Sequence, residues 1–175
     1  MGRLLLVFLC LVSASAMLKA QETAADRELL GILEMQADLA EAAETGAGEE
    51  TLLIRSQRIA DRYDSFLERN PDHLHGWILC GKFLRSVGAD ARALAAFRKA
   101  RSLAPDLAVL HEQMGLTLAD MGEIEAAMAL LLRAVELDPE EPVYREDLGR
   151  FLIRFGSELE KGGAIDLGRA EILAA

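Results

Sequence analysis

Three prolines, at positions 71, 105 and 139, divide the chain at an interval of 34 residues. The two segments that follow this interval, 74–107 and 108–141, are similar when one is written over the other. Eight positions are identical in both copies: Gly81 and Gly115, Leu84 and Leu118, Gly88 and Gly122, Ala93 and Ala127, Ala95 and Ala129, Ala100 and Ala134, Leu103 and Leu137, and Pro105 and Pro139. A fixed period of this length indicates a repeat architecture, in which each copy folds into the same unit and packs on its neighbours.

Each copy is predicted to be a pair of antiparallel helices. In the first copy, apolar residues recur at helical spacing over 77–87, stop at Gly88, and resume over 94–103 before Pro105. Small residues stand where neighbouring helices need to approach closely, at Gly81, Ala93 and Ala100. Each pair is apolar on more than one face, so a single unit cannot bury itself and must stack on others.

This repeat resembles the tetratricopeptide repeat, whose pattern places Trp, Leu-Gly, Tyr, Ala, Phe, Ala and Pro at fixed offsets. The first copy offers Trp77, Cys80-Gly81, Leu84, Ala93, Phe97, Ala100 and Pro105 at those offsets. The second copy offers His111, Met114-Gly115, Leu118, Ala127, Leu131, Ala134 and Pro139. A third copy keeps Leu148-Gly149, Leu152 and Gly156, but has Lys161 and Leu173 in place of an Ala and the Pro. The resemblance covers residues 50–160 and implies an all-α, right-handed superhelix of about three units with an additional N-terminal helix.

The repeat register predicts the domain organisation. It assigns 74–107 to a first repeat, 108–141 to a second, and 142–175 to a partial or degenerate third, in which Gly162-Gly163 interrupts the helical pattern and residues 164–175 resume it. Residues 50–73 fit the second half of an earlier, degenerate unit, with Ile59, Tyr63, Phe66 and Pro71 at family positions. Residues 21–49 are predicted to form an amphipathic, acidic helix and a loop. We interpret this helix as a solvated cap, with an acidic docking surface as the alternative.

Residues 1–20 read as a secretory signal peptide. Arg3 precedes a nine-residue apolar run, Leu4 to Val12, and Ser13-Ala14-Ser15-Ala16 supplies small residues for cleavage. Cleavage is predicted after Ala16, with Ala20 as the second choice. The chain is therefore expected to be exported, in the bacterial manner, to the periplasm or cell envelope. An uncleaved anchor in the inner membrane is the alternative, although a spanning helix needs roughly twenty apolar residues.

Charge and cysteine content argue against binding to nucleic acid and against an intramolecular disulfide. Nineteen basic against twenty-nine acidic residues give a net charge of -10, which disfavours binding to nucleic acid. Loss of the leader removes Cys10 and leaves Cys80 alone, so no intramolecular disulfide is expected. Cys80 lies in an apolar run, where a buried thiol is commoner than a nucleophile.

No catalytic, metal or cofactor site is predicted. Gly76 to Lys82 matches part of a phosphate loop, but Phe83 stands where Ser or Thr would bind magnesium, and Gly81 belongs to the repeat. The three histidines, His73, His75 and His111, lack the spacing of a metal site. No serine lies in a G-x-S-x-G motif. The sequence therefore favours a protein that is not an enzyme.

The resemblance also implies a candidate binding surface, because the first helix of each pair lines the concave face in tetratricopeptide repeats. The corresponding residues are His75, Ile78, Lys82 and Arg85 in the first unit, Glu112, Leu116 and Asp120 in the second, and Glu146, Arg150 and Arg154 in the third. The ends of this groove are basic and its middle is acidic and apolar. A solvated helix surface with no partner is the alternative interpretation.

The leading hypothesis is a non-catalytic scaffold that binds a protein or peptide segment in this groove. The alternative is a self-associating module that stacks on a second copy through its C-terminal end. An accessory domain of an enzyme complex is a third hypothesis, which the lack of a convergent nucleophile, base or metal set disfavours.

Overall fold

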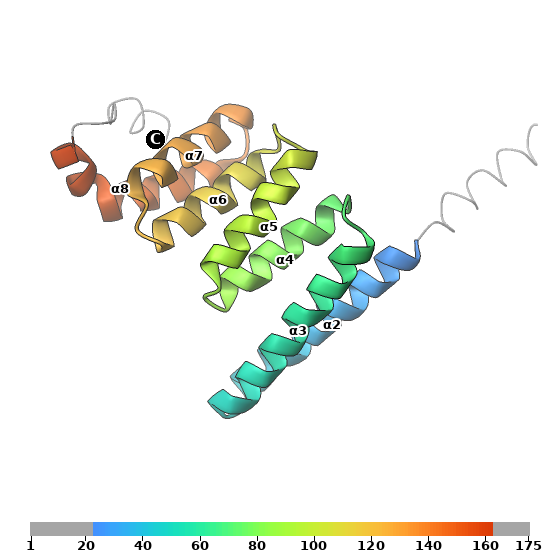
Figure 1. The fold of residues 1–175 in the computed structure, drawn as a ribbon. Coiled ribbons are helices and arrows are strands. Elements are labelled where there is room, and N and C mark those ends of the chain that lie inside the picture. Colours follow the sequence, from blue (N-terminus) through green and yellow to red (C-terminus); the bar gives the residue numbers. More distant parts are fainter. Residues whose placement is uncertain (1–22, 163–175) are drawn as a thin grey trace, which may run out of the picture. The chain divides into compact units, whose positions relative to one another are not determined.

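The computed structural model describes residues 23–162, which fold into seven α-helices in two compact units. The first unit ends at Asn70 and the second begins at Pro71. The leader predicted at 1–20 and the predicted helix at 164–175 lie outside the described residues. The predicted fold class, all-α with antiparallel helix pairs, is confirmed, as Figure 1 shows.

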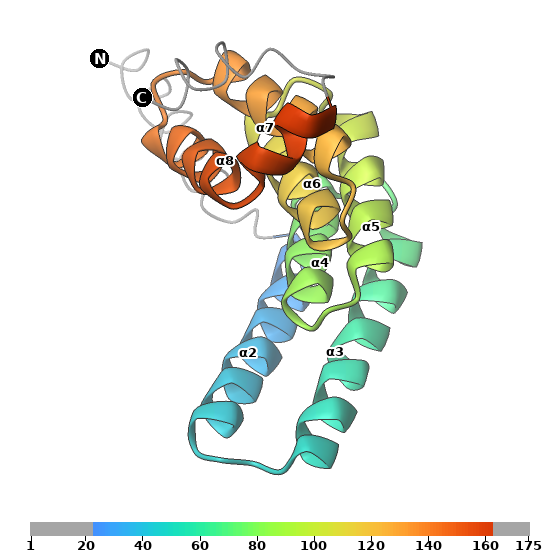
Figure 2. The same cartoon turned by 90° about the vertical axis from the view of Figure 1, so that its left-hand side faces the viewer.

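The first unit is a hairpin of two helices, α2 (Ala24–Glu44) and α3 (Glu49–Arg69), which run antiparallel (Figures 1 and 2). Thr23 begins α2 with a capping box, because its side chain accepts from the backbone N–H of Asp26 while its own N–H donates to the Asp26 carboxylate. The turn between the helices passes through Gly46 at a φ of 81°, a conformation that favours glycine. Both helices have 21 residues, whereas α4 to α7 of the second unit have 13 or 14.

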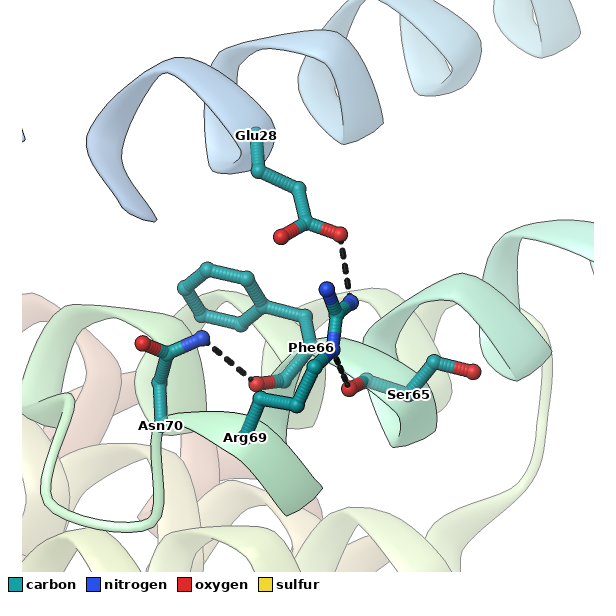
Figure 3. Close-up of polar contacts among 5 residues, drawn as sticks. All are labelled: Glu28, Ser65, Phe66, Arg69 and Asn70. Atoms are coloured by element: carbon teal, nitrogen blue, oxygen red, sulfur yellow. Dashed lines mark hydrogen bonds and ion pairs between the residues drawn. The ribbon is translucent and has the colours of Figure 1, made fainter. Parts of the chain in front are cut away.

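The open end of this hairpin is held by polar contacts between α2 and α3 (Figure 3). Arg69 Nη2 lies 2.6 Å from Glu28 Oε1, and Arg69 Nε donates to the carbonyl of Ser65 at 2.9 Å. Asn70 Nδ2 donates to the carbonyl of Phe66 at 2.9 Å, which satisfies a backbone acceptor at the end of α3. The Arg69–Glu28 pair joins the two helices, whereas the contacts of Arg69 with Ser65 and of Asn70 with Phe66 lie within the end of α3.

The second unit contains five helices whose starts follow the period of 34. The first helices are α4 (Leu74–Ser86), α6 (Ala108–Asp120) and α8 (Pro142–Gly162), and the second helices are α5 (Asp90–Leu103) and α7 (Ile124–Leu137). Each helix packs against the next in the chain, and α6 also contacts both α4 and α8 (Figures 1 and 2). The tight turns within the pairs pass through Gly88 and Gly122 at φ values of 74° and 83°.

Small residues allow the paired helices to approach closely, as predicted. A Cβ added at Gly81 would lie 2.5 Å from the ring of Phe97, and one added at Gly115 would lie 2.9 Å from Leu131. The repeated alanines of the second helices are fully buried: Ala93, Ala100, Ala127 and Ala134. Packing therefore requires these residues to be small.

A hydrogen bond to a turn proline recurs in each repeat and explains the divergent residue at one family position. Trp77 Nε1 donates to the carbonyl of Pro71 at 2.8 Å. In the next repeat, His111 Nε2 lies 2.7 Å from the carbonyl oxygen of Pro105. In the third, Arg145 Nη2 donates to the carbonyl of Pro139 at 2.7 Å. Indole, imidazole and guanidinium groups can each donate an N–H, and in all three repeats the side chain at this position reaches the carbonyl of the turn proline.

The third repeat departs from the pattern because α8 continues through Gly156. In the register this glycine corresponds to Gly88 and Gly122, but among the described residues only Gly46, Gly88 and Gly122 have a positive φ. Continuation of the helix buries Leu159, which is 4% exposed. Residues 158–162, which the register places in a second helix, therefore belong to α8.

Candidate functional site

The first helices of the three repeats form a groove in the second unit. A hollow of about 160 Å³ lies over α4, α6 and α8. Its lining is Arg85 from α4; Leu116, Ala119 and Asp120 from α6; and Asp147, Arg150, Phe151, Arg154 and Phe155 from α8. We call this surface the α4–α6–α8 groove. Its walls carry three guanidinium groups and two carboxylates around an apolar floor.

Arg85 and Asp120 connect the first two repeats across the groove. Arg85 Nε and Nη2 each lie 3.0 Å from Asp120 Oδ2, so one carboxylate oxygen accepts from both donors. Their side chains are 28% and 39% exposed, so water weakens the attraction and the pair contributes little stability. Its effect is to hold the Arg85 guanidinium in place and to neutralise it.

The α8 wall combines an ion pair between buried Asp147 and exposed Arg150 with two tilted aromatic rings. Asp147, whose side chain is 9% exposed, accepts a hydrogen bond from Arg150 Nη2 one helical turn away. The rings of Phe151 and Phe155 lie 5.1 Å apart between centroids, and the guanidinium of Arg154 lies 4.8 Å above the ring of Phe155. This cation–π contact holds the Arg154 guanidinium against an aromatic surface without neutralising its charge.

Glu112 lies at the boundary between α6 and α8 and is 5% exposed. Gln113 Nε2 donates to Glu112 Oε2 at 2.8 Å, and Asp147 forms a further side-chain hydrogen bond with Glu112. Burial, and then the hydrogen bond with Asp147, raise the pKa of Glu112 to about 7, although the positive charge of Lys82 acts in the opposite direction. At neutral pH this carboxyl group is therefore close to half protonated.

Half of the residues that the sequence placed in the groove line this hollow. They are Arg85, Leu116, Asp120, Arg150 and Arg154. The others lie elsewhere on the same helices: His75, Lys82 and Glu146 are exposed, Ile78 is half-buried, and Glu112 is buried beneath the groove. The groove is thus narrower than predicted and lies toward the C-terminal ends of α4 and α6.

Four lining residues are outside that set, namely Ala119, Asp147, Phe151 and Phe155. The signal that could have found the last three is an offset of 35 residues between neighbouring first helices. Arg85 pairs with Asp120 at this offset, and Glu112 contacts Asp147 at the same offset. Adding 35 to Leu116 likewise gives Phe151, and both line the hollow. Comparison at 34 residues aligns equivalent positions and misses these cross-helix neighbours.

The comparison with protein families agrees with the geometry. A tetratricopeptide-repeat family model matches residues 108–141, which is the central helix pair α6 and α7. The five stacked helices of the second unit agree with this match. Residues 108–141 form a tetratricopeptide repeat. No match is found for the chain in a comparison with curated proteins.

Solved structures with the same fold are similar to this chain at low sequence identity. A crystal structure of MamA is 19% identical, with a TM-score of 0.53 over 62% of this chain and 63% of that one, so the chain spans less than two thirds of its length. MamA from Desulfovibrio magneticus RS-1 is 20% identical, with a TM-score of 0.54 over 81% of this chain and 94% of that one. A mutant O-GlcNAc transferase from Thermobaculum terrenum is 22% identical, with a TM-score of 0.54 over 75% of this chain but only 23% of the transferase. Identities this low support the fold alone.

The part of the chain that the structure describes was compared with the requirements of a metal site and of a membrane-spanning helix. Within residues 23–162, no three His, Cys, Asp or Glu side chains converge as metal ligands. Cys80 is 2% exposed in the core of the second unit. No helix in the same range is both long and apolar enough to cross a membrane.

Proposed function

We propose that this chain is a non-catalytic interaction protein that binds a segment of another protein in the α4–α6–α8 groove. The observation that carries the proposal is the chemistry of Arg154. Its guanidinium lies above the ring of Phe155, lines the hollow, and forms no ion pair with a carboxylate of the described chain. A positive charge held beside an apolar floor is a recognition element for an acidic group that carries an apolar neighbour.

The balance of charge in the groove supports a ligand of this kind. Asp120 neutralises Arg85, and Asp147 neutralises Arg150, so the charge of Arg154 is left over. Leu116 and Phe155, both half-buried, offer apolar surface in the same hollow. The ligand that fits is a peptide segment in which an Asp or Glu lies next to a large apolar or aromatic side chain. The acidic group sets orientation and encounter rate, while the apolar contact supplies most of the affinity.

A selection from a displayed library of random peptides tests this function with the purified chain as bait. Enrichment of peptides that pair an acidic residue with an adjacent apolar or aromatic residue is the expected result. A synthetic copy of the most enriched peptide is then titrated by fluorescence anisotropy. Binding should weaken as salt increases, because a charge pair at a solvent-exposed groove is screened.

Two variants decide whether the selected peptide occupies the groove. Arg154→Glu reverses the unpaired charge and should abolish binding of the peptide. Arg98→Glu makes the same change on the exposed face of the second helix α5 and should leave binding unchanged. No enrichment of such peptides, or equal binding by both variants, would overturn the proposed function.

Self-association through the C-terminal end is a second candidate function. The observation that favours it is Ile153, which projects from α8 with 89% of its surface exposed. Sedimentation velocity of the parent and of Ile153→Ser distinguishes the two functions. A dimer of the parent that Ile153→Ser dissociates would support self-association. A parent that is monomeric at all concentrations would exclude self-association and leave peptide binding in the groove as the proposed function.

We also propose that the chain is exported through the leader at 1–20, which the apolar run and the small residues at 13–16 support. Mass spectrometry of the N-terminus of protein recovered from a bacterial host's periplasm tests the proposal. Cleavage after Ala16 or Ala20 is expected. An N-terminus that begins at Met1 in the membrane fraction would instead support the anchor.

A further inference from the structure

A pair of carboxyl groups is buried at the boundary between the second and third repeats. Glu112 on α6 is 5% exposed and Asp147 on α8 is 7% exposed. The two helices are in contact, and Asp147 is the charged neighbour that acts most strongly on the Glu112 carboxyl group. Two carboxylates cannot form a hydrogen bond without a proton, because an ionised carboxylate is only an acceptor. A hydrogen bond between Glu112 and Asp147 therefore requires a proton on one of them.

The surroundings of this pair supply too little positive charge to ionise both groups. Arg150 on α8 donates to Asp147, and Gln113 donates a neutral N–H to Glu112. The positive charge of Lys82 on α4 favours the ionised form of Glu112 without a hydrogen bond. On α8, Glu146 adds a negative charge and Tyr144 adds a neutral hydroxyl group. No charged side chain of the described parts of α5 or α7 forms an ion pair or a hydrogen bond with Glu112. One guanidinium thus serves two buried carboxyl groups.

We propose that the proton shared by Glu112 and Asp147 controls how firmly α8 packs on α6, and thereby whether the α8 wall of the groove is formed. With the proton present, the pair is a neutral acid that donates to a carboxylate, and the helices are joined. Without it, two like charges are buried side by side, and the molecule relieves the repulsion by letting water in between α6 and α8. The raised pKa of Glu112, about 7, places this change at neutral pH.

The consequence for binding rests on the function proposed above, whereas the consequence for packing does not. Arg150, Phe151, Arg154 and Phe155 all reach the groove from α8. Loosening of α8 removes the unpaired cation and the aromatic floor together. Binding of an acidic peptide is therefore expected to be stronger below pH 7 than above it.

Hydrogen exchange of the full chain measures the packing of α8 without any ligand. Amide exchange in α8 is compared at pH 6 and pH 8 after division by the intrinsic rate at each pH. If opening of α8 returns Glu112 to its ordinary pKa of 4.5, the corrected rate should increase by about tenfold between these pH values. Amides of α4 and α5 should change much less, since neither helix carries a member of the pair.

Two variants separate this pair from other titrating groups. Glu112→Gln keeps an N–H donor for Asp147 but cannot ionise, so the tenfold increase should disappear. Glu146→Gln removes an exposed carboxylate from the neighbouring turn of α8 and should retain the increase. An increase that persists in Glu112→Gln, or no increase in the parent, would overturn the proposal.

A second measurement does not depend on whether the variants fold. The side-chain carbon resonance of Glu112 in the parent is followed by NMR between pH 4 and pH 9, and a midpoint near 7 is expected. A midpoint below 5 would overturn the proposal.

The selected peptide is then titrated at pH 6 and pH 8. If no peptide is selected, the function proposed for the groove fails. The exchange and NMR results still decide whether the proton controls the packing of α8.

Discussion

Arg85 and Asp120 form an ion pair across two repeats, and they are 35 residues apart in a chain whose period is 34. The extra residue arises because the neighbouring first helices are not stacked in register. The same offset joins Glu112 to Asp147 at the next boundary. Residues that meet along the groove are therefore separated by one period plus one residue, and an alignment of the repeats at 34 residues does not bring them together.

The coupling between Arg85 and Asp120 is expected to be small but measurable. A double-mutant cycle with Arg85→Ala and Asp120→Ala should give a coupling free energy of about 0.2–1 kcal/mol, because both side chains are partly exposed. Urea unfolding at low salt supplies the four stabilities, and 1 M salt should reduce the coupling. Additive effects of the two substitutions would show that the pair does not form in solution.

Gly81→Ala is expected to destabilise the second unit by about 1–3 kcal/mol, since the new methyl group would overlap the ring of Phe97. Phe97 is fully buried and cannot move aside without disturbing the core. Urea unfolding monitored by circular dichroism measures the change. An unchanged midpoint would mean that α4 and α5 pack less closely than the structure shows.

Gly156→Ala is expected to have the opposite effect. Gly156 lies inside α8 with no atom within 4 Å of an added Cβ, so alanine gains helix propensity without a clash. Stability should increase by about 0.5–1 kcal/mol in the same assay. Destabilisation would indicate that Gly156 forms a turn in solution, as its counterparts Gly88 and Gly122 do.

The repeats could be predicted from the sequence because their determinants are local and periodic. Gly88 and Gly122 end helices in both copies, and Gly81 and Gly115 recur where the pairs touch. Gly156 shares the register of the turn glycines, yet α8 continues, because burial of Leu159 favours a longer helix. The period alone cannot show which of these two effects is larger.

The groove could be predicted only in part, for a different physical reason. Which helices face it follows from the resemblance, but which side chains meet depends on the twist between repeats. That twist brings Glu112 next to Asp147 and buries Glu112. From the sequence, an acidic residue at this position of a first helix is predicted to be exposed in the groove. Phe155 likewise is predicted as a core residue of a helix pair, although it is half-buried and lines the groove, while Phe151 both lines the groove and belongs to the core.

Ala100→Leu and Ala134→Leu are each expected to cost about 1–3 kcal/mol, because both alanines are fully buried in the second helices. Ala95→Leu and Ala129→Leu are matched controls, since these alanines occupy the same helices but are exposed. Differential scanning calorimetry should show lower melting temperatures for the first two variants only. Equal melting of all four variants with the parent would show that the register of the stack is wrong.

Stability should also depend on pH through Glu112. Burial and the hydrogen bond with Asp147 raise its pKa from 4.5 to about 7, so between these values the folded chain holds a proton that the unfolded chain has released. The free energy of unfolding contributed by this group is fully present below pH 4.5 and is lost as the pH increases through 7. Urea unfolding at pH 5, 6, 7 and 8 should therefore show a decrease for the parent that is smaller for Glu112→Gln. His111, which is also buried, is present in both proteins, so the difference between them isolates Glu112. Parallel curves for the two proteins would place Glu112 in water at the surface, and would remove the physical basis for proton control of α8.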